Sequence, residues 1–177
     1  MDIVKYFENF FSTGKPDKIE ESVAPQPSKP DYYERLKMAE SSGMAEVKSK
    51  TSSATGHHQF IEGTWKSLTT KYGKDYSLED RKDPTKSLEI AKLFTEENKA
   101  SLQKALEREP TDTELYAAHF LGTTGAKKFL MASPFDRATK VVQKEQVARN
   151  KNIFYDDKGK PRTVFQVHEI LKKKIGE

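Results

Sequence analysis

The chain has 177 residues, enough for one compact domain with an extension but too few for two full domains. Hydrophobic residues make up 34% and charged residues 33%, so part of the chain must contribute little to a core. The sequence contains no cysteine, which excludes disulfide bonds and thiolate metal sites.

The formal net charge of +4 is unevenly distributed along the chain. Residues 137–177 contain 11 Lys and Arg against 5 Asp and Glu, whereas residues 1–136 have a small acidic excess. Such a basic end is typical of a surface that contacts nucleic acid, an anionic membrane or an anionic cell wall, or of an ordinary solvated surface. No run of about 18 apolar residues occurs, so we expect no stable membrane insertion.

Residues 1–12 predict a short amphipathic helix, because apolar side chains recur there at helical spacing. Residues 13–30 contain four prolines, one glycine and few apolar residues, which is typical of a flexible linker. The helix either docks on a partner or surface, or packs back on the domain. The start lacks a basic n-region, and Asp2 and Glu8 interrupt its apolar residues, so we expect no secretory signal.

The rest of the chain has a mainly α-helical pattern. Asp31 can cap a first helix, and the small, polar residues 43–58 predict a loop. Residues 62–72 return to helical spacing, and Asp83 before Pro84 marks the start of the next helix. The apolar residues expected on these helices are Tyr32, Tyr33, Leu36, Met38, Trp65, Leu68, Tyr72, Leu88, Ala91, Leu93, Phe94, Leu102 and Leu106.

The second half of the sequence predicts further helices and very little β structure. Residues 111–114 and 163–166 each have the composition of a capping box, with Thr at the first position and Glu or Gln at the last. Residues 122–125 predict a turn between two glycines, followed by a short helix over 126–131. The best strand pattern is one small β-hairpin within 153–164.

Glu40 is the strongest candidate for catalysis. It stands at the end of the apolar-faced first helix, before two serines and a glycine that ends this helix. A carboxyl group in this place can project from a rigid element into a cleft, as a general acid must. An exposed glutamate near a helix end has the same local sequence, so the residue alone leaves both interpretations open.

The four histidines do not predict a metal site. His57 and His58 are adjacent, so their side chains cannot share one helix face, and the H-E-x-x-H pattern is missing. Residues 122–128, GTTGAKK, lack the spacing of a phosphate-binding loop. We therefore expect neither a metal nor another cofactor.

Several short motifs occur in an order that suggests a family. Glu40 is followed by serine, "GHHQF" occupies 56–60, and Thr-Trp occupies 64–65; "AAHFLG" follows at 117–122. Together these motifs resemble the soluble lytic transglycosylases, in the branch found in bacteriophages and in some proteobacterial cell-wall proteins. The resemblance covers about residues 31–132.

The resemblance implies a lysozyme-like domain over residues 31–177 that cleaves the glycan strands of peptidoglycan. Glu40 would be the single catalytic acid and base, and the product would be a 1,6-anhydro-muramoyl end. No cofactor would be needed. Phe60 and Trp65 are expected to belong mainly to the core. The residues that the resemblance places at the substrate are Ser41, Ser42, His58, Gln59, Phe60 and His119.

The sequence also departs from the family pattern. His57 and His58 occupy positions that are usually apolar, and we expect His58 to face the cleft rather than His57. His119 and Phe120 stand where the family has Tyr and Asn, which puts the positioning of the substrate in doubt. His119 can still donate a hydrogen bond to the sugar or to Glu40.

The biological setting is inferred from the missing export signal. We expect a virion-associated enzyme that is made in the host cytoplasm and acts on the cell wall, with residues 1–12 docked on a phage structural protein. An endolysin that reaches the wall through a holin is the nearest alternative. A water-using muramidase, a structural virion protein with a lysozyme-like fold, and a nucleic-acid-binding protein supported by the basic C-terminal region are the other hypotheses.

Overall fold

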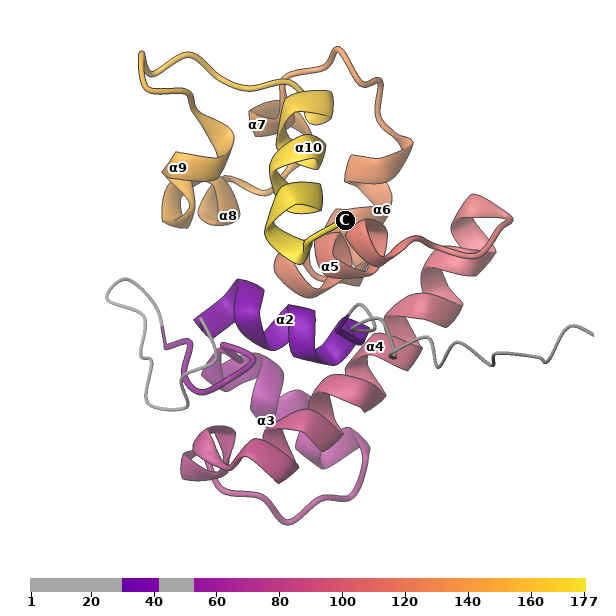
Figure 1. The fold of residues 1–177 in the computed structure, drawn as a ribbon, viewed down its shortest axis with the longest axis vertical. Coiled ribbons are helices and arrows are strands. Elements are labelled where there is room, and N and C mark those ends of the chain that lie inside the picture. Colours follow the sequence, from indigo (N-terminus) through magenta and orange to yellow (C-terminus); the bar gives the residue numbers. More distant parts are fainter. Residues whose placement is uncertain (1–29, 42–52) are drawn as a thin grey trace, which may run out of the picture.

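The protein is mainly helical, as the sequence predicts (Figure 1). This computed structural model describes residues 30–41 and 53–177, so the predicted helix over 1–12, nearly all of the linker, and Ser42 lie outside the described residues. The helices are α2 (Tyr32–Ser41), α3 (Glu62–Lys71), α4 (Pro84–Leu106), α5 (Asp112–Leu121), α6 (Thr123–Met131), α7 (Ala138–Val141), α8 (Lys144–Arg149), α9 (Lys151–Phe154) and α10 (Val164–Ile175), with a 3-10 helix, η1, at Glu79–Lys82.

The predicted helix starts are confirmed by their capping hydrogen bonds. The Asp31 carboxylate accepts from the Glu34 amide at 2.8 Å, and the Asp83 carboxylate accepts from the first turn of α4. Both capping boxes, at 111–114 and at 163–166, are complete. These side chains satisfy backbone N–H groups that have no partner within the helix, so the helix starts follow from local chemistry.

Two hydrophobic clusters form the core. The larger surrounds α5, which packs against α4, α6 and α10, and it includes Leu36 from α2. The smaller joins Trp65 and Leu68 of α3 to Ile90 of α4, with Phe60 beside them. Figure 1 shows α2 and α4 running between the α3 region and the group of helices α5–α10. Helix α4 therefore contributes to both clusters and fixes their relative position.

Three details differ from the sequence-based expectations. Residues 122–125 do not form a turn: Gly122 precedes α6 with φ 73°, and α6 begins at Thr123. The hairpin within 153–164 is reduced to one isolated bridge between Tyr155 and Pro161, because its first residues belong to α9. Met38, expected on the apolar face of the first helix, is 57% exposed.

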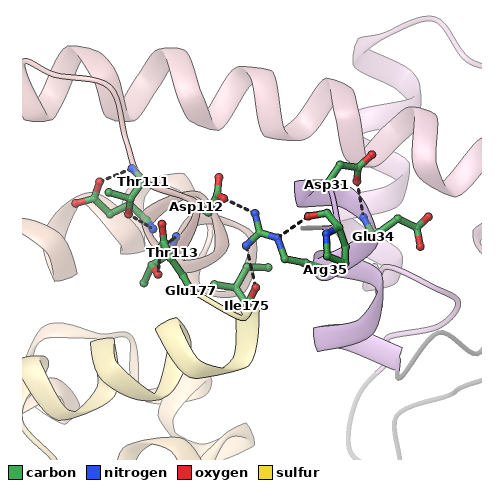
Figure 2. Close-up of polar contacts among 10 residues, drawn as sticks. Asp31, Glu34, Arg35, Thr111, Asp112, Thr113, Ile175 and Glu177 are labelled. Carbon is green, nitrogen blue, oxygen red and sulfur yellow. Dashed lines mark hydrogen bonds and ion pairs between the residues drawn. The ribbon is translucent and has the colours of Figure 1, made fainter. Parts of the chain in front are cut away.

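Arg35 ties the start of α2 to the ends of two distant helices (Figure 2). Its guanidinium pairs with Asp112 at the start of α5 and donates to the Ile175 carbonyl at 3.0 Å. Its Nε donates to the Pro30 carbonyl at 3.1 Å. The side chain is only 11% exposed, so these partners would be left partly desolvated without it.

Replacing Arg35 by Met is therefore expected to lower the free energy of unfolding by about 2–4 kcal/mol, because it breaks a partly buried ion pair and several hydrogen bonds. Urea denaturation measures this loss. Lys37→Met on the same helix is the control: it removes an exposed pair with Glu34 and is expected to cost less than about 1 kcal/mol. Equal losses in the two variants would contradict the role given to Arg35.

Candidate functional site

A cleft of about 290 Å³ lies where the two hydrophobic clusters meet. It brings together residues from α2, α3, α4, α5 and α8 and from the segment that precedes α3. The residues that line it are Glu40, Ala54, Gln59, Phe60, Ile61, Thr64, Phe94, His119, Phe120, Gly122, Gln146, Arg149 and Asn150. The cleft thus brings together four residues that widely separated motifs predict as site residues: Glu40, Gln59, Phe60 and His119.

Glu40 projects from the last turn of α2 into this cleft. Its Oε1 is buried and has no hydrogen-bond partner among the described residues. Tyr116 of α5 stands beside the carboxyl group: burial, the charge of Glu40 and a hydrogen bond with Glu40 all raise the pKa of this phenol. Tyr116 therefore stays protonated and can donate to the carboxylate. The carboxyl group of Glu40 thus lies beside a protonated phenol at the end of a helix.

The segment Gly56–Phe60 forms a tight turn on the cleft wall. Thr55 and Phe60 are joined by a backbone bridge, and the Gln59 amide donates to the Gly56 carbonyl at 3.2 Å. Gln59 has φ 48°, a left-handed conformation that is uncommon outside glycine. Its side-chain Nε2 also donates to the Gly56 carbonyl, at 2.8 Å, which fixes the amide on the wall. Such strained conformations concentrate at functional sites.

Arg81 of η1 stabilises this turn through hydrogen bonds to backbone carbonyls. Its guanidinium donates to the Ser53 carbonyl at 2.8 Å and to the Phe60 carbonyl at 3.3 Å. Gly56 lies so close to the Arg81 backbone that a Cβ on Gly56 would be 1.9 Å from the Arg81 carbonyl oxygen. The glycine in the "GHHQF" motif is thus required by a close backbone approach as well as by its φ of +82°.

The prediction that His58 faces the cleft is wrong. His58 is 2% exposed, its Nδ1 forms a 2.9 Å hydrogen bond with Ser87 Oγ of α4, and it is not among the lining residues. Its backbone carbonyl accepts a hydrogen bond from His119 Nε2 at 3.0 Å. His58 therefore supports the wall from inside, and His119 is the histidine on the cleft.

One ring nitrogen of His119 has no hydrogen-bond partner in the part of the chain that the structure describes. Because Nε2 donates to the His58 carbonyl, Nδ1 is the acceptor of the neutral ring, and it is buried with no hydrogen bond among the described residues. The ring lies edge-on to Phe60, with centroids 5.6 Å apart. His119 thus occupies the cleft as an ordered hydrogen-bonding group between aromatic rings.

Ser41, the serine directly after Glu40, does not line the cleft. Ser41 is buried, and its hydroxyl donates to the Lys37 carbonyl at 3.0 Å within α2. This is the expected behaviour of a serine inside a helix. Ser42 lies outside the described residues, so its predicted role stays a prediction. Phe60 and Trp65 are both buried and in contact, which confirms their place in the core.

Sequence reasoning missed one side of the cleft entirely. Gln146, Arg149 and Asn150 reach it from α8 and the residue after it, and Phe94 reaches it from α4. Tyr116 was also missed, since its contact with Glu40 joins residues 76 positions apart. No local motif marks Gln146 and Arg149, because α8 is a helix of six residues and is too short to show a clear hydrophobic period.

Buried His58 gives a testable pH dependence. Burial, followed by the neighbouring His119, lowers the pKa of His58 from 6.5 to about 3. In the unfolded chain the His58 ring binds a proton below about pH 6.5, whereas in the folded chain it binds this proton only near pH 3. The free energy of unfolding is therefore expected to fall as the pH is lowered through this range, by at most about 1.4 kcal/mol per unit from this group.

NMR titration of the His58 ring, combined with urea denaturation at several pH values, checks this expectation. His58→Gln should show a shallower loss of stability between pH 6.5 and about pH 4 than the wild type. A His58 ring that titrates near its ordinary pKa in the folded protein would contradict it.

Among the described residues, no group of three or more His, Cys, Asp or Glu side chains is arranged to hold a metal ion. In the same part of the chain, no helix has the length and apolar character needed to cross a membrane. No model of a known protein family matches the sequence.

Proposed function

We propose that the protein is a peptidoglycan lytic transglycosylase that cleaves the β-1,4 bond between N-acetylmuramic acid and N-acetylglucosamine. The observation that carries this proposal is the position of Glu40: its carboxyl group lies at the end of a helix on the wall of a cleft, together with Gln59 and His119. A general acid needs a fixed position on a cleft that the substrate can enter.

The proposed reaction uses Glu40 twice. The protonated carboxyl group gives its proton to the glycosidic oxygen, and the bond from that oxygen to C1 of the muramoyl residue breaks. The resulting carboxylate then takes the proton of the muramoyl 6-hydroxyl, whose oxygen bonds to C1. Glu40 ends protonated again, and water is not consumed. Glu40 is the sole carboxylate among the described lining residues, which favours this scheme over a two-carboxylate hydrolysis.

Other cleft residues have roles that suit a glycan. The Gln59 amide, fixed on the turn, would lie near the acetamido group that stabilises positive charge at C1. The His119 ring lines the same cleft, where it can contact a sugar. Phe120 occupies the place of the family asparagine, but Gln146 and Asn150 bring amide groups to the same cleft from another helix. These amides compensate for the missing asparagine.

The setting proposed for this activity is the phage virion. In that setting residues 1–12 would dock on a phage structural protein, and the enzyme would act locally on the wall during infection. The basic C-terminal region would favour contact with an anionic wall. An endolysin released to the wall at the end of infection is the competing setting for the same chemistry.

Release of soluble fragments from dye-labelled, purified cell walls tests the proposal. The wild-type protein is expected to release dye in proportion to enzyme and time, and heat-denatured protein should release none. If well-folded protein releases no dye from walls of several bacterial types, the proposed activity fails. A structural virion protein with a lysozyme-like fold then becomes the better account, with Phe120 marking a lost site.

A further inference from the structure

Arg149 differs from every other arginine in the described part of the chain. It is exposed and lines the cleft, and its guanidinium forms no hydrogen bond or ion pair with another described residue. Each of the others donates at least one hydrogen bond to the protein: Arg35, Arg81, Arg108, Arg137 and Arg162. Among the described arginines, Arg149 is thus the one whose guanidinium has no partner within the described part of the fold.

The two cleft residues nearest to Arg149 in sequence carry neutral amides. Gln146 and Asn150 lie three positions before and one after it, and both line the cleft. The Asn150 side chain donates to the Gln146 carbonyl at 2.9 Å, and Gln146 Nε2 forms a long hydrogen bond of 3.5 Å to the Phe120 carbonyl. These contacts fix the end of α8 and the frame from which Arg149 extends. Amides suit the hydroxyl and acetamido groups of a glycan, whereas a guanidinium suits an anion.

We propose that Arg149 binds a carboxylate of the peptide attached to the muramoyl residue, and so makes the enzyme prefer peptide-bearing strands. This inference rests on the proposed function. The sugar rings of a peptide-bearing strand are uncharged, and the carboxylates of the peptide are its anionic groups next to the scissile bond. Arginine pairs with carboxylates through two parallel N–H···O bonds, which gives both attraction and orientation. Arg149 is a specificity-determining residue in this account, while Glu40 performs the chemistry.

A matched pair of substrates tests the inference. Glycan strands from purified walls are prepared with peptide carboxylates free or converted to neutral methylamides, and kcat/KM is obtained from strand shortening by mass spectrometry. The wild type is expected to prefer the free carboxylates by about 10-fold, the effect of one charge-assisted hydrogen bond pair. Arg149→Gln should cleave both substrates at the rate that the wild type shows on the neutral one.

Lys144→Gln is the control, because it removes the same charge from the same helix without touching the cleft. It should keep the wild-type preference. Equal wild-type rates on the two substrates, or an Arg149→Gln variant that keeps the preference or slows both substrates equally, would overturn the inference while leaving the proposed function intact. If wild type cleaves neither substrate, the proposed function itself fails and the inference with it.

Discussion

Replacing Glu40 by Gln is expected to lower the rate of glycan cleavage by about 10²- to 10⁴-fold, the usual contribution of a general acid and base. The amide keeps the shape of the side chain and can still accept a hydrogen bond from Tyr116, but its N–H protons are too weakly acidic to be given to the glycosidic oxygen. Because the substitution removes the negative charge of a carboxyl group whose Oε1 is buried and has no partner among the described residues, its thermal stability should be unchanged or higher.

The comparison is made by dye release from labelled walls and by thermal denaturation of the same samples. Glu34→Gln, at an exposed position of the same helix, should keep wild-type activity. A Glu40→Gln variant that is folded and retains more than about a tenth of the activity would exclude Glu40 as the sole acid and base.

Gly56→Ala is expected to be the most destabilising single substitution at the cleft wall, at a cost of about 3 kcal/mol or more. The added Cβ would lie 1.9 Å from the Arg81 carbonyl oxygen, and φ at this position is +82°, which alanine rarely adopts. The neighbouring atom is backbone, so it cannot rotate away. Relief of the clash would displace the turn that holds Gln59, and activity should fall as well.

Urea denaturation measures the change, and Gly63→Ala is its matched control. Gly63 lies in the first turn of α3, and the Cβ that alanine would add there has no neighbouring atom within 4 Å, so the same substitution should be neutral or stabilising. Similar losses at both positions would show that the close approach of Gly56 to Arg81 does not matter.

Local chemistry explains which parts of the fold were predictable. Asp31, Asp83, Thr111 and Thr163 each cap a helix with their own side chain, so the start of the helix depends on residues within three positions. The helices α7, α8 and α9 were not predicted. Each has four to six residues, too few to show a hydrophobic period, and they form because they pack on the larger cluster.

The site was predictable in part for the same reason. Motif order identified Glu40, Gln59 and His119, which the fold brings to one cleft. The direction of His58 was not predictable, because it depends on Ser87, 29 positions away, and on the turn conformation of Gly56. Arg149 has no motif at all, and only the packing of α8 shows that it belongs to the cleft.

The most direct test of the central claim is mass spectrometry of wild-type digests of purified peptidoglycan made in heavy-oxygen water. If Glu40 catalyses intramolecular attack by the 6-hydroxyl, the new muramoyl ends will be 1,6-anhydro ends without heavy oxygen. Reducing muramic ends that contain heavy oxygen would contradict the account, because they would show that water is the nucleophile and that the protein is a muramidase.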